Sequence, residues 1–462
     1  MLNLSLKHTA ITLVFSAVMG VIIAINPLYM AAPIGALIIW LLTRSAVLRF
    51  IYIVIGSLLV FQSSSNFGLQ KVAFLIGIIV VTLISFHQTR PLLKERQYKT
   101  LVPVLFTSYV FGFYVIVCIV LSILRGANEL TVIRDAAPYL IFSITPLLAF
   151  DFSKHIKRSV VTKLFILVGI YATISCSYGW IVRRGITDAD SGMTSIGFPS
   201  FMLSFAFFIY CCALALRGKH KVFIWTILSA FTIAALLITG TRSTFLALIG
   251  PLVILLSGKG LSYFKRFQRG VYVSLIFILS FFVGVSLLLS VTNIEKEKFY
   301  ERISMIGSVF DKKSRLNDYS YIERTNQTEA TLLAFKESPI VGMGPGYIFK
   351  VKKYNGVEYN YVSLDSKYSI MAKYGMLGYL ILVVWLWNIY VYLRRSSEGR
   401  VYTLNSLTII GYISIVILCM VISVPIEDKG YGIAFLLLFV LKINENRNSE
   451  LDNLLNDGNN SK

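Results

Sequence analysis

The chain has 462 residues, of which 56% are hydrophobic and only 15% are charged, and its mean hydropathy is +0.72. Soluble domains carry about a quarter of their residues as Asp, Glu, Lys and Arg, so this chain has too little polar surface to cover a core in water. The composition excludes a soluble globular protein. It predicts an all-α polytopic membrane protein, because helices satisfy their backbone hydrogen bonds within the bilayer.

The formal net charge of +21 would indicate a nucleic-acid partner in a soluble protein. Here the Lys and Arg residues gather in short segments between apolar runs, which is the positive-inside pattern of membrane proteins. No nucleic-acid motif accompanies them, so we expect no such partner. The five cysteines lie within apolar runs, and no cluster has metal-ligand spacing. We therefore expect neither a metal nor another cofactor.

A membrane-crossing helix needs about 20 residues, and the apolar runs predict about 12–14 such helices. About eleven spans form an N-terminal bundle in residues 1–291, a large loop follows in 292–364, and further spans occupy 365–443. The tail 444–462 is rich in Asn, Asp and Glu, which predicts a disordered segment. The predicted spans are 9–25, 31–43, 47–62, 71–87, 101–124, 136–151, 164–182, 197–216, 222–240, 243–258, 271–291, 366–393, 404–424 and 430–443.

The loops between these spans alternate between basic and mixed charge. Six basic loops fall on one side of the predicted membrane, which places both termini in the cytoplasm. The mixed loops and the 292–364 loop then face outward, and in a bacterial inner membrane that side is the periplasm.

The 292–364 loop is the longest polar segment in the chain. Ser320 and Glu323 have the spacing of a capping box and predict a helix that runs to about Glu337. Arg324 and Thr328 lie on one polar stripe of that helix. An arginine in a first helical turn opposes the macrodipole, which favours anions there. It is either an anion-binding residue or a solvated loop arginine.

A turn with closely spaced glycines, residues 339–346, follows the predicted helix. Gly342, Gly344 and Gly346 leave backbone N–H groups available, which can form an anion-binding nest. The same spacing also fits a plain turn after a proline stop. It matches neither a nucleotide-binding P-loop nor a dinucleotide fingerprint.

Further charged residues lie at the outer ends of predicted spans. Arg242 sits in a very short turn between two spans, and Arg134 directly precedes the span that begins at 136. Each is either a ligand for an anion or a snorkelling side chain. Asp365 precedes another span, where it can act as a base toward a hydroxyl or cap the helix. Because arginine binds phosphate oxygens in a bidentate manner, a lipid-linked pyrophosphate fits this set of residues.

The order of these motifs resembles the bacterial O-antigen polymerase and O-antigen ligase superfamily. The resemblance rests on the turn 239–248, the segment from Arg324 to the glycine turn, and residues 365–368 followed by Gly375 and Gly378. It covers about residues 235–380. It implies a metal-independent glycosyltransferase that uses undecaprenyl-pyrophosphate-linked sugars on the periplasmic face of the inner membrane.

The resemblance also implies roles for individual residues. Arg242 and Arg324 would hold the pyrophosphate and stabilise its charge as it leaves. Ligase-like members present a histidine near the exit of the large loop, but this chain has none after His220, which favours the polymerase. Expected partners are a lipid-linked glycan donor and acceptor, the bilayer and a chain-length regulator; the alternatives are a ligase and a lipid-linked oligosaccharide flippase. The candidate site comprises the catalytic residues Arg242, Arg324 and Asp365 and the substrate-binding residues Arg134, Thr328, Gly344, Gly346 and Tyr368.

Overall fold

A computed structural model describes ten stretches of the chain. They are residues 39–60, 69–91, 98–182, 198–217, 222–238, 319–353, 356–364, 366–395, 404–420 and 429–460. Arg242, Asp365 and the predicted spans 9–25, 243–258 and 271–291 lie outside these residues.

The described stretches are almost entirely helical, which confirms the predicted all-α membrane class. Five helices are long and apolar enough to cross a bilayer by length and composition, and four more apolar helices are shorter. The elements are α3 (Ala46–Val60), α4 (Leu69–Thr89), α5 (Val102–Leu124), α6 (Glu129–His155), α7 (Arg158–Val182), α8 (Phe198–Arg217), α9 (Val222–Ile238), α14 (Tyr319–Glu337), β1 (Phe349–Lys352), β2 (Glu358–Tyr361), α15 (Ser369–Arg395), α16 (Leu404–Met420) and α17 (Lys429–Asn460).

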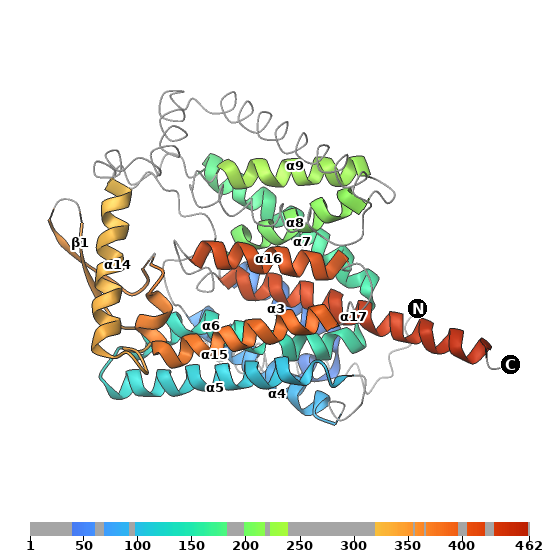
Figure 1. Ribbon diagram of the computed structural model, residues 1–462, viewed down its shortest axis with the longest axis horizontal. Helices are drawn as coiled ribbons and strands as arrows, with labels where there is room; N and C mark the ends of the chain where they lie inside the picture. Colours follow the sequence, from blue (N-terminus) through green and yellow to red (C-terminus); the bar gives the residue numbers. More distant parts are fainter. Residues whose placement is uncertain are drawn as a thin grey trace, which may run out of the picture.

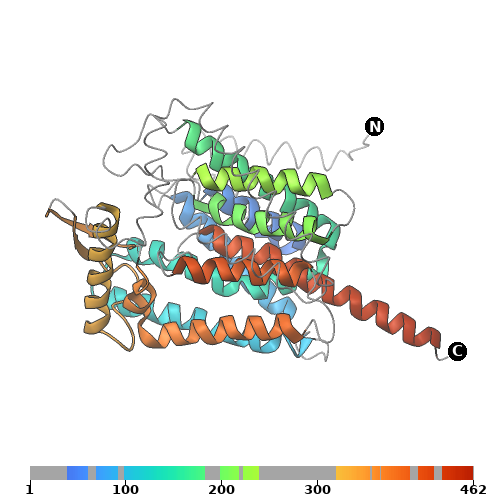
Figure 2. The ribbon, with the colours of Figure 1, turned by 45° about the horizontal axis from the view of Figure 1, so that its top comes forward.

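The apolar helices form a bundle, and α14 lies across one end of it (Figures 1 and 2). The hairpin of β1 and β2 lies beside α14 at that same end, whereas the last turns of α17 project from the opposite end (Figure 1). Helix α14 and the hairpin therefore form a separate layer over one mouth of the bundle. We call this the α14 end.

The bundle core is centred on α6 and α17. Helix α17 packs along α6, and Phe142 of α6 contacts the rings of Trp385, Tyr431 and Phe435. Because α6 is surrounded on most sides, it has almost no lipid-facing surface. A strongly buried helix of this kind fixes the positions of its neighbours at both ends.

A buried ion pair joins three helices at the end opposite α14. Arg49 of α3 is 1% exposed and donates to Asp151 of α6 at 3.1 Å, and Ser85 of α4 donates to the same carboxylate at 2.7 Å. Arg49 lies within the predicted span 47–62, in the first turn of α3, and its side chain turns into the bundle. Its charge is therefore neutralised inside the protein.

Two helix boundaries and the interior of one helix differ from the predictions. Helix α6 begins at Glu129 rather than 136, because the Asn128 side chain caps it by accepting from the Thr131 N–H at 3.1 Å. Helix α15 contains a break at Gly375 that the span 366–393 did not anticipate. The tail was predicted to be disordered from 444, but α17 continues to Asn460. Its residues 444–447 bind the end of α6, where Arg447 donates to the Ser153 carbonyl at 3.2 Å.

The loop also contains a β-hairpin that was not predicted. Phe349 pairs with Tyr361 and Lys352 with Glu358 in antiparallel register. The signal was present in the sequence, because alternating apolar and charged residues precede an Asn-Gly turn dipeptide at 355–356. The buried residues Phe349 and Val351 pack with Ala334 of α14 in a small core of their own. That core keeps α14 and the hairpin together as one layer.

Candidate functional site

The 339–346 glycine turn inserts into the break in α15. Gly375 has φ 65° and ψ −176°, a backbone conformation that is essentially restricted to glycine. In an uninterrupted helix the carbonyls of residues 372 and 373 would accept from the N–H groups of residues 376 and 377. The break separates these carbonyls from these N–H groups. The glycine turn supplies other donors for the carbonyls and other acceptors for the N–H groups.

The hydrogen bonds are exchanged one for one. The N–H groups of residues 343 and 344 donate to the carbonyls of residues 372 and 373 at 2.8 and 2.9 Å. In return, the N–H groups of residues 376 and 377 donate to the carbonyls of Pro339 and Ile340 at 2.8 and 3.2 Å. The Tyr114 hydroxyl of α5 donates to the Tyr374 carbonyl at 2.8 Å. The turn and the broken helix are therefore one hydrogen-bonded unit.

The glycines in this turn are required by space as well as by backbone conformation. Gly342, Gly344 and Gly346 have φ values of 82°, 93° and 78°. A Cβ at Gly344 would overlap the Ser122 hydroxyl of α5, and one at Gly346 would come within 2.7 Å of Val132 of α6. The sequence predicted this turn, and the structure shows it packed between two membrane helices.

A buried ion pair fixes the turn from the other side. Lys373 of α15 donates to Asp135 of α6 at 2.6 Å, and these side chains are 0% and 5% exposed. The second carboxylate oxygen of Asp135 accepts from the Gly346 N–H at 2.8 Å. One carboxylate thus connects α6, α15 and the glycine turn, and we call Asp135, Lys373 and Gly346 the clamp.

Arg125 adds a third attachment at the end of α5. Its guanidinium donates to the carbonyls of Gly342 and Met343 at 3.1 and 3.2 Å. Arg134 lies nearby in the second turn of α6, where its side chain is exposed, and it interacts electrostatically with the buried Lys71 of α4. Arg125 and Arg134 therefore place two positive charges near the turn, whereas the carboxylate of Asp135 is buried and paired.

Helix α14 carries the predicted polar stripe. Arg324 and Thr328 are half-buried, and none of the described residues forms an ion pair with Arg324. One turn beyond Thr328, the buried Thr331 hydroxyl lies 2.7 Å from the Ser366 hydroxyl, immediately before α15. The stripe therefore leads from Arg324 down to the start of the membrane helix.

The opposite side of α14 faces the hairpin. The Tyr361 hydroxyl donates to the Glu323 carboxylate at 3.4 Å, and burial together with that carboxylate raises the pKa of Tyr361. Asn326 donates to the Lys352 carbonyl at 2.7 Å. Glu323 is therefore engaged by a tyrosine that remains a neutral donor.

The structure brings some predicted site residues together and leaves others apart. Arg324 and Thr328 share the stripe on α14, and Tyr368 lies just past Ser366 at its lower end. Gly344 and Gly346 lie in the buried turn, where their N–H groups already donate to protein acceptors. Arg134 is at the α14 end, but on α6. An anion at the turn would have to be bound by side chains, because these two N–H groups are occupied.

Sequence reasoning missed two members of the clamp, Asp135 and Lys373, and two residues that support the turn. Asp135 and Lys373 are charged residues within apolar helices, and such residues are rare unless they are paired or functional. That is the signal that could have identified them. Nothing in the sequence pairs residues separated by 238 positions. Arg125 and Tyr114 gave no signal, because arginine at a helix end and tyrosine in a span are both common.

Comparison with known families matches part of this unit to a family model. Residues 227–383 match the family model described as O-antigen ligase. This match is consistent with the O-antigen ligase and polymerase superfamily. No curated protein sequence matches the chain significantly. The matched O-antigen ligase region extends from α9 through α14 and the glycine turn into α15, so it includes Arg324 and Lys373.

The apolar helices indicate a multi-pass membrane protein, and residues 227–383 of it are similar to the O-antigen ligase family. Asp135 and Arg125 lie outside the O-antigen ligase region, yet they hold its glycine turn. Among the described residues, no group of three or more His, Cys, Asp or Glu side chains could hold a metal ion. Within the described residues, the candidate site contains arginines, hydroxyls and one paired carboxylate.

Proposed function

We propose that this protein is an integral-membrane glycosyltransferase that polymerises undecaprenyl-pyrophosphate-linked oligosaccharide repeat units on the periplasmic face of a bacterial inner membrane. The observation that carries the proposal is the position of Arg324. It lies on a helix inside the O-antigen ligase region, over one mouth of a membrane bundle, with no ion-pair partner among the described residues. A cation without a protein partner at a membrane mouth is suited to an anionic, lipid-borne substrate.

The proposed reaction is a glycosyl transfer. A hydroxyl oxygen of the acceptor repeat unit attacks the anomeric carbon of the donor glycan, and the bond from that carbon to the pyrophosphate oxygen breaks. The hydroxyl proton passes to a base, for which Asp365 is the candidate, or to water. Undecaprenyl pyrophosphate leaves with the bonding electrons. Arg324 and Arg242 would stabilise the additional negative charge through bidentate hydrogen bonds.

The polymerase is preferred to the ligase on the sequence. Ligase-like members present a histidine near the exit of the large loop, and this chain has none after His220. The ligase is retained as a second candidate because the matching family is described as O-antigen ligase. Both enzymes would use the same lipid-linked donor and differ in the acceptor.

Deleting the gene and examining surface polysaccharide on a gel separates these functions. A polymerase mutant retains a single repeat unit on the lipid A-core and loses the long ladder. A ligase mutant loses every repeat from the core and accumulates long lipid-linked chains. Lipid-linked units retained on the cytoplasmic face would instead identify a flippase and refute a glycosyltransferase.

The arginine role is tested in the complemented deletion strain. Arg324→Ala and Arg242→Ala should abolish the ladder while the protein still inserts. Arg324→Lys should restore little, because an ammonium lacks the bidentate fork. Lys336→Ala is the matched control, since Lys336 is an exposed cation on the same helix. Normal ladders from both arginine variants would refute the pyrophosphate role.

A further inference from the structure

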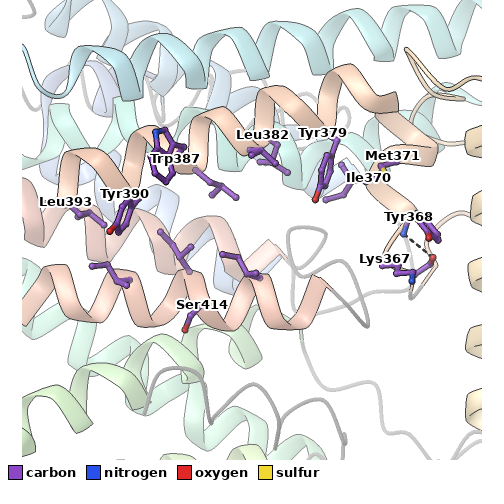
Figure 3. Close-up of a pocket in the computed structure, with 16 residues that line it drawn as sticks. Lys367, Tyr368, Ile370, Met371, Tyr379, Leu382, Trp387, Tyr390, Leu393 and Ser414 are labelled. Carbon is purple, nitrogen blue, oxygen red and sulfur yellow. Dashed lines mark hydrogen bonds between the residues drawn. The ribbon is translucent and has the colours of Figure 1, made fainter. Parts of the chain in front are cut away.

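An apolar groove runs along α15 on the side that faces α16. Helix α15 packs against α5, whereas α16 packs against α8 and α17, so the two helices diverge and leave a space between them. The groove has a volume of about 690 Å³, within the range of about 300–1,000 Å³ typical of ligand sites. In Figure 3, Tyr379 and Tyr390 point from α15 into this space.

The walls of the groove are hydrocarbon for almost their whole length. Tyr379, Val383 and Trp387 line it from α15 at helical spacing, and Ile413 and Ile417 line it from α16. Trp387 is 61% exposed and Ile417 is 53% exposed, so the groove opens toward the surrounding lipid. A slot with this lining takes an apolar chain.

One end of the groove is polar and cationic. Ser366, Lys367 and Tyr368 line that end, and the Lys367 ammonium lies 5.1 Å from the centre of the Tyr368 ring. The Ser366 hydroxyl also contacts Thr331 of α14, two turns along the helix from Arg324. Seven residues of helix correspond to about 10 Å. A head group at this end of the groove would therefore lie within reach of the proposed pyrophosphate site.

The length of the groove distinguishes between classes of lipid. Beyond the break at Gly375, the lining from Tyr379 to Leu393 covers 14 helical steps, or about 21 Å at 1.5 Å per residue. The hydrocarbon core of a bilayer is about 30 Å thick, so an acyl chain of one leaflet spans only about half of it. A chain that fills the groove is longer than an ordinary acyl chain.

We propose that the groove between α15 and α16 holds the polyprenyl chain of the anionic, lipid-linked substrate, with its phosphate-bearing end at Lys367 and Tyr368. This inference rests on the proposed function for the identity of the substrate. The groove would hold the chain in one orientation and deliver the pyrophosphate to the lower end of the α14 stripe.

Direct lipid binding to the purified full-length protein in nanodiscs tests the groove. The probe is undecaprenyl pyrophosphate, with undecaprenol and phosphatidylglycerol as comparators. Val383→Trp fills the groove and should raise the Kd for undecaprenyl pyrophosphate at least tenfold. Val384→Trp is the matched control, because Val384 is the next residue on α15, is 50% exposed and does not line the groove. Its Kd should stay within about twofold of wild type.

Lys367→Gln tests the polar end separately. It should weaken binding of undecaprenyl pyrophosphate but leave undecaprenol binding unchanged, since the neutral alcohol does not need the cation. If Val383→Trp fails to fold, a photo-crosslinking residue at Ile413 should label with undecaprenyl pyrophosphate and lose that label when the unlabelled lipid is added.

Equal weakening by the two tryptophan variants would overturn the proposal, as would equal competition by phosphatidylglycerol. The experiments distinguish an error in the groove assignment from an error in the proposed function. If the deletion strain kept a normal polysaccharide ladder, the enzyme assignment would fall, whatever lipid is bound. If the ladder were lost but Val383→Trp bound lipid normally, only the groove assignment would fall.

Discussion

The clamp gives the sharpest test of how the loop is joined to the membrane bundle. Asp135→Asn keeps an oxygen that can accept from the Gly346 N–H, but it removes the negative charge to which the buried Lys373 ammonium donates. Removing one partner of a buried pair costs about 3–5 kcal/mol, because the remaining charge stays buried. Lys373→Met leaves the opposite charge uncompensated and should cost a similar amount.

The double variant Asp135→Asn, Lys373→Met removes both charges and retains an acceptor for Gly346. Replacing a buried ion pair by uncharged groups of similar volume is often neutral. We therefore expect the double variant to recover most of the lost free energy of unfolding, with a coupling of at least about 2 kcal/mol. The measurement is a denaturant titration of the purified protein in detergent micelles, followed for all four members of the cycle.

Additive losses would refute this reasoning. If the double variant lost the sum of the two single losses to within about 0.5 kcal/mol, the two side chains would be energetically independent. If neither single variant lost more than about 1 kcal/mol, the pair would not be buried as the structure shows. A matched control is Arg158→Gln, because Arg158 forms an ion pair with Glu445 while remaining 41% exposed. Exposed pairs contribute at most about 1 kcal/mol.

Three further predictions concern the glycine turn. Gly344→Ala should prevent recovery of folded protein in a size-exclusion assay, because its Cβ would overlap the Ser122 hydroxyl. Gly356→Ala is the control, since nothing lies within 4 Å of a Cβ there. It should cost only about 1–2 kcal/mol of backbone strain. Gly375→Ala should also be severe, because its Cβ would overlap the Ile340 carbonyl; wild-type yield would contradict the break in α15. Arg125→Ala should lower the free energy of unfolding by about 0.5–1.5 kcal/mol, because the arginine is exposed and its two hydrogen bonds are only partly shielded from water. An unchanged titration midpoint would show that Arg125 does not hold the turn.

Much of the fold could be predicted from local sequence signals. Hydrophobic runs of sufficient length located the apolar helices, because a bilayer leaves few alternatives to a helix. The capping-box spacing at Ser320 located α14, whose end at Glu337 agrees with the prediction. What was missed depends on tertiary contacts. The extension of α17 past 444 depends on partners at the end of α6, such as the Ser153 carbonyl. Amino-acid composition alone does not predict these contacts.

In the candidate site, too, local sequence signals predicted some residues, and tertiary contacts that the sequence does not show determine the others. The motif order pointed to Arg324 and to the glycine turn, because a polar stripe and closely spaced glycines are visible in sequence. The residues that position the turn could not be predicted from local sequence signals, because Asp135 and Lys373 come together only in the folded bundle. The roles of Arg242 and Asp365 stay predictions, since neither lies within the described residues.

The exchanged hydrogen bonds explain why a helix break and a glycine turn occur together in this fold. A broken membrane helix exposes carbonyls and N–H groups, and each one left buried and unpaired costs about 1–3 kcal/mol. The turn supplies both the donors and the acceptors that Gly375 has separated, so neither segment can be rearranged without the other. Because the turn directly follows α14, movement of the first part of α15 would carry the end of α14 with it. Arg324 is therefore held in register with the membrane helices by backbone bonds at the break, and the loop cannot position it alone.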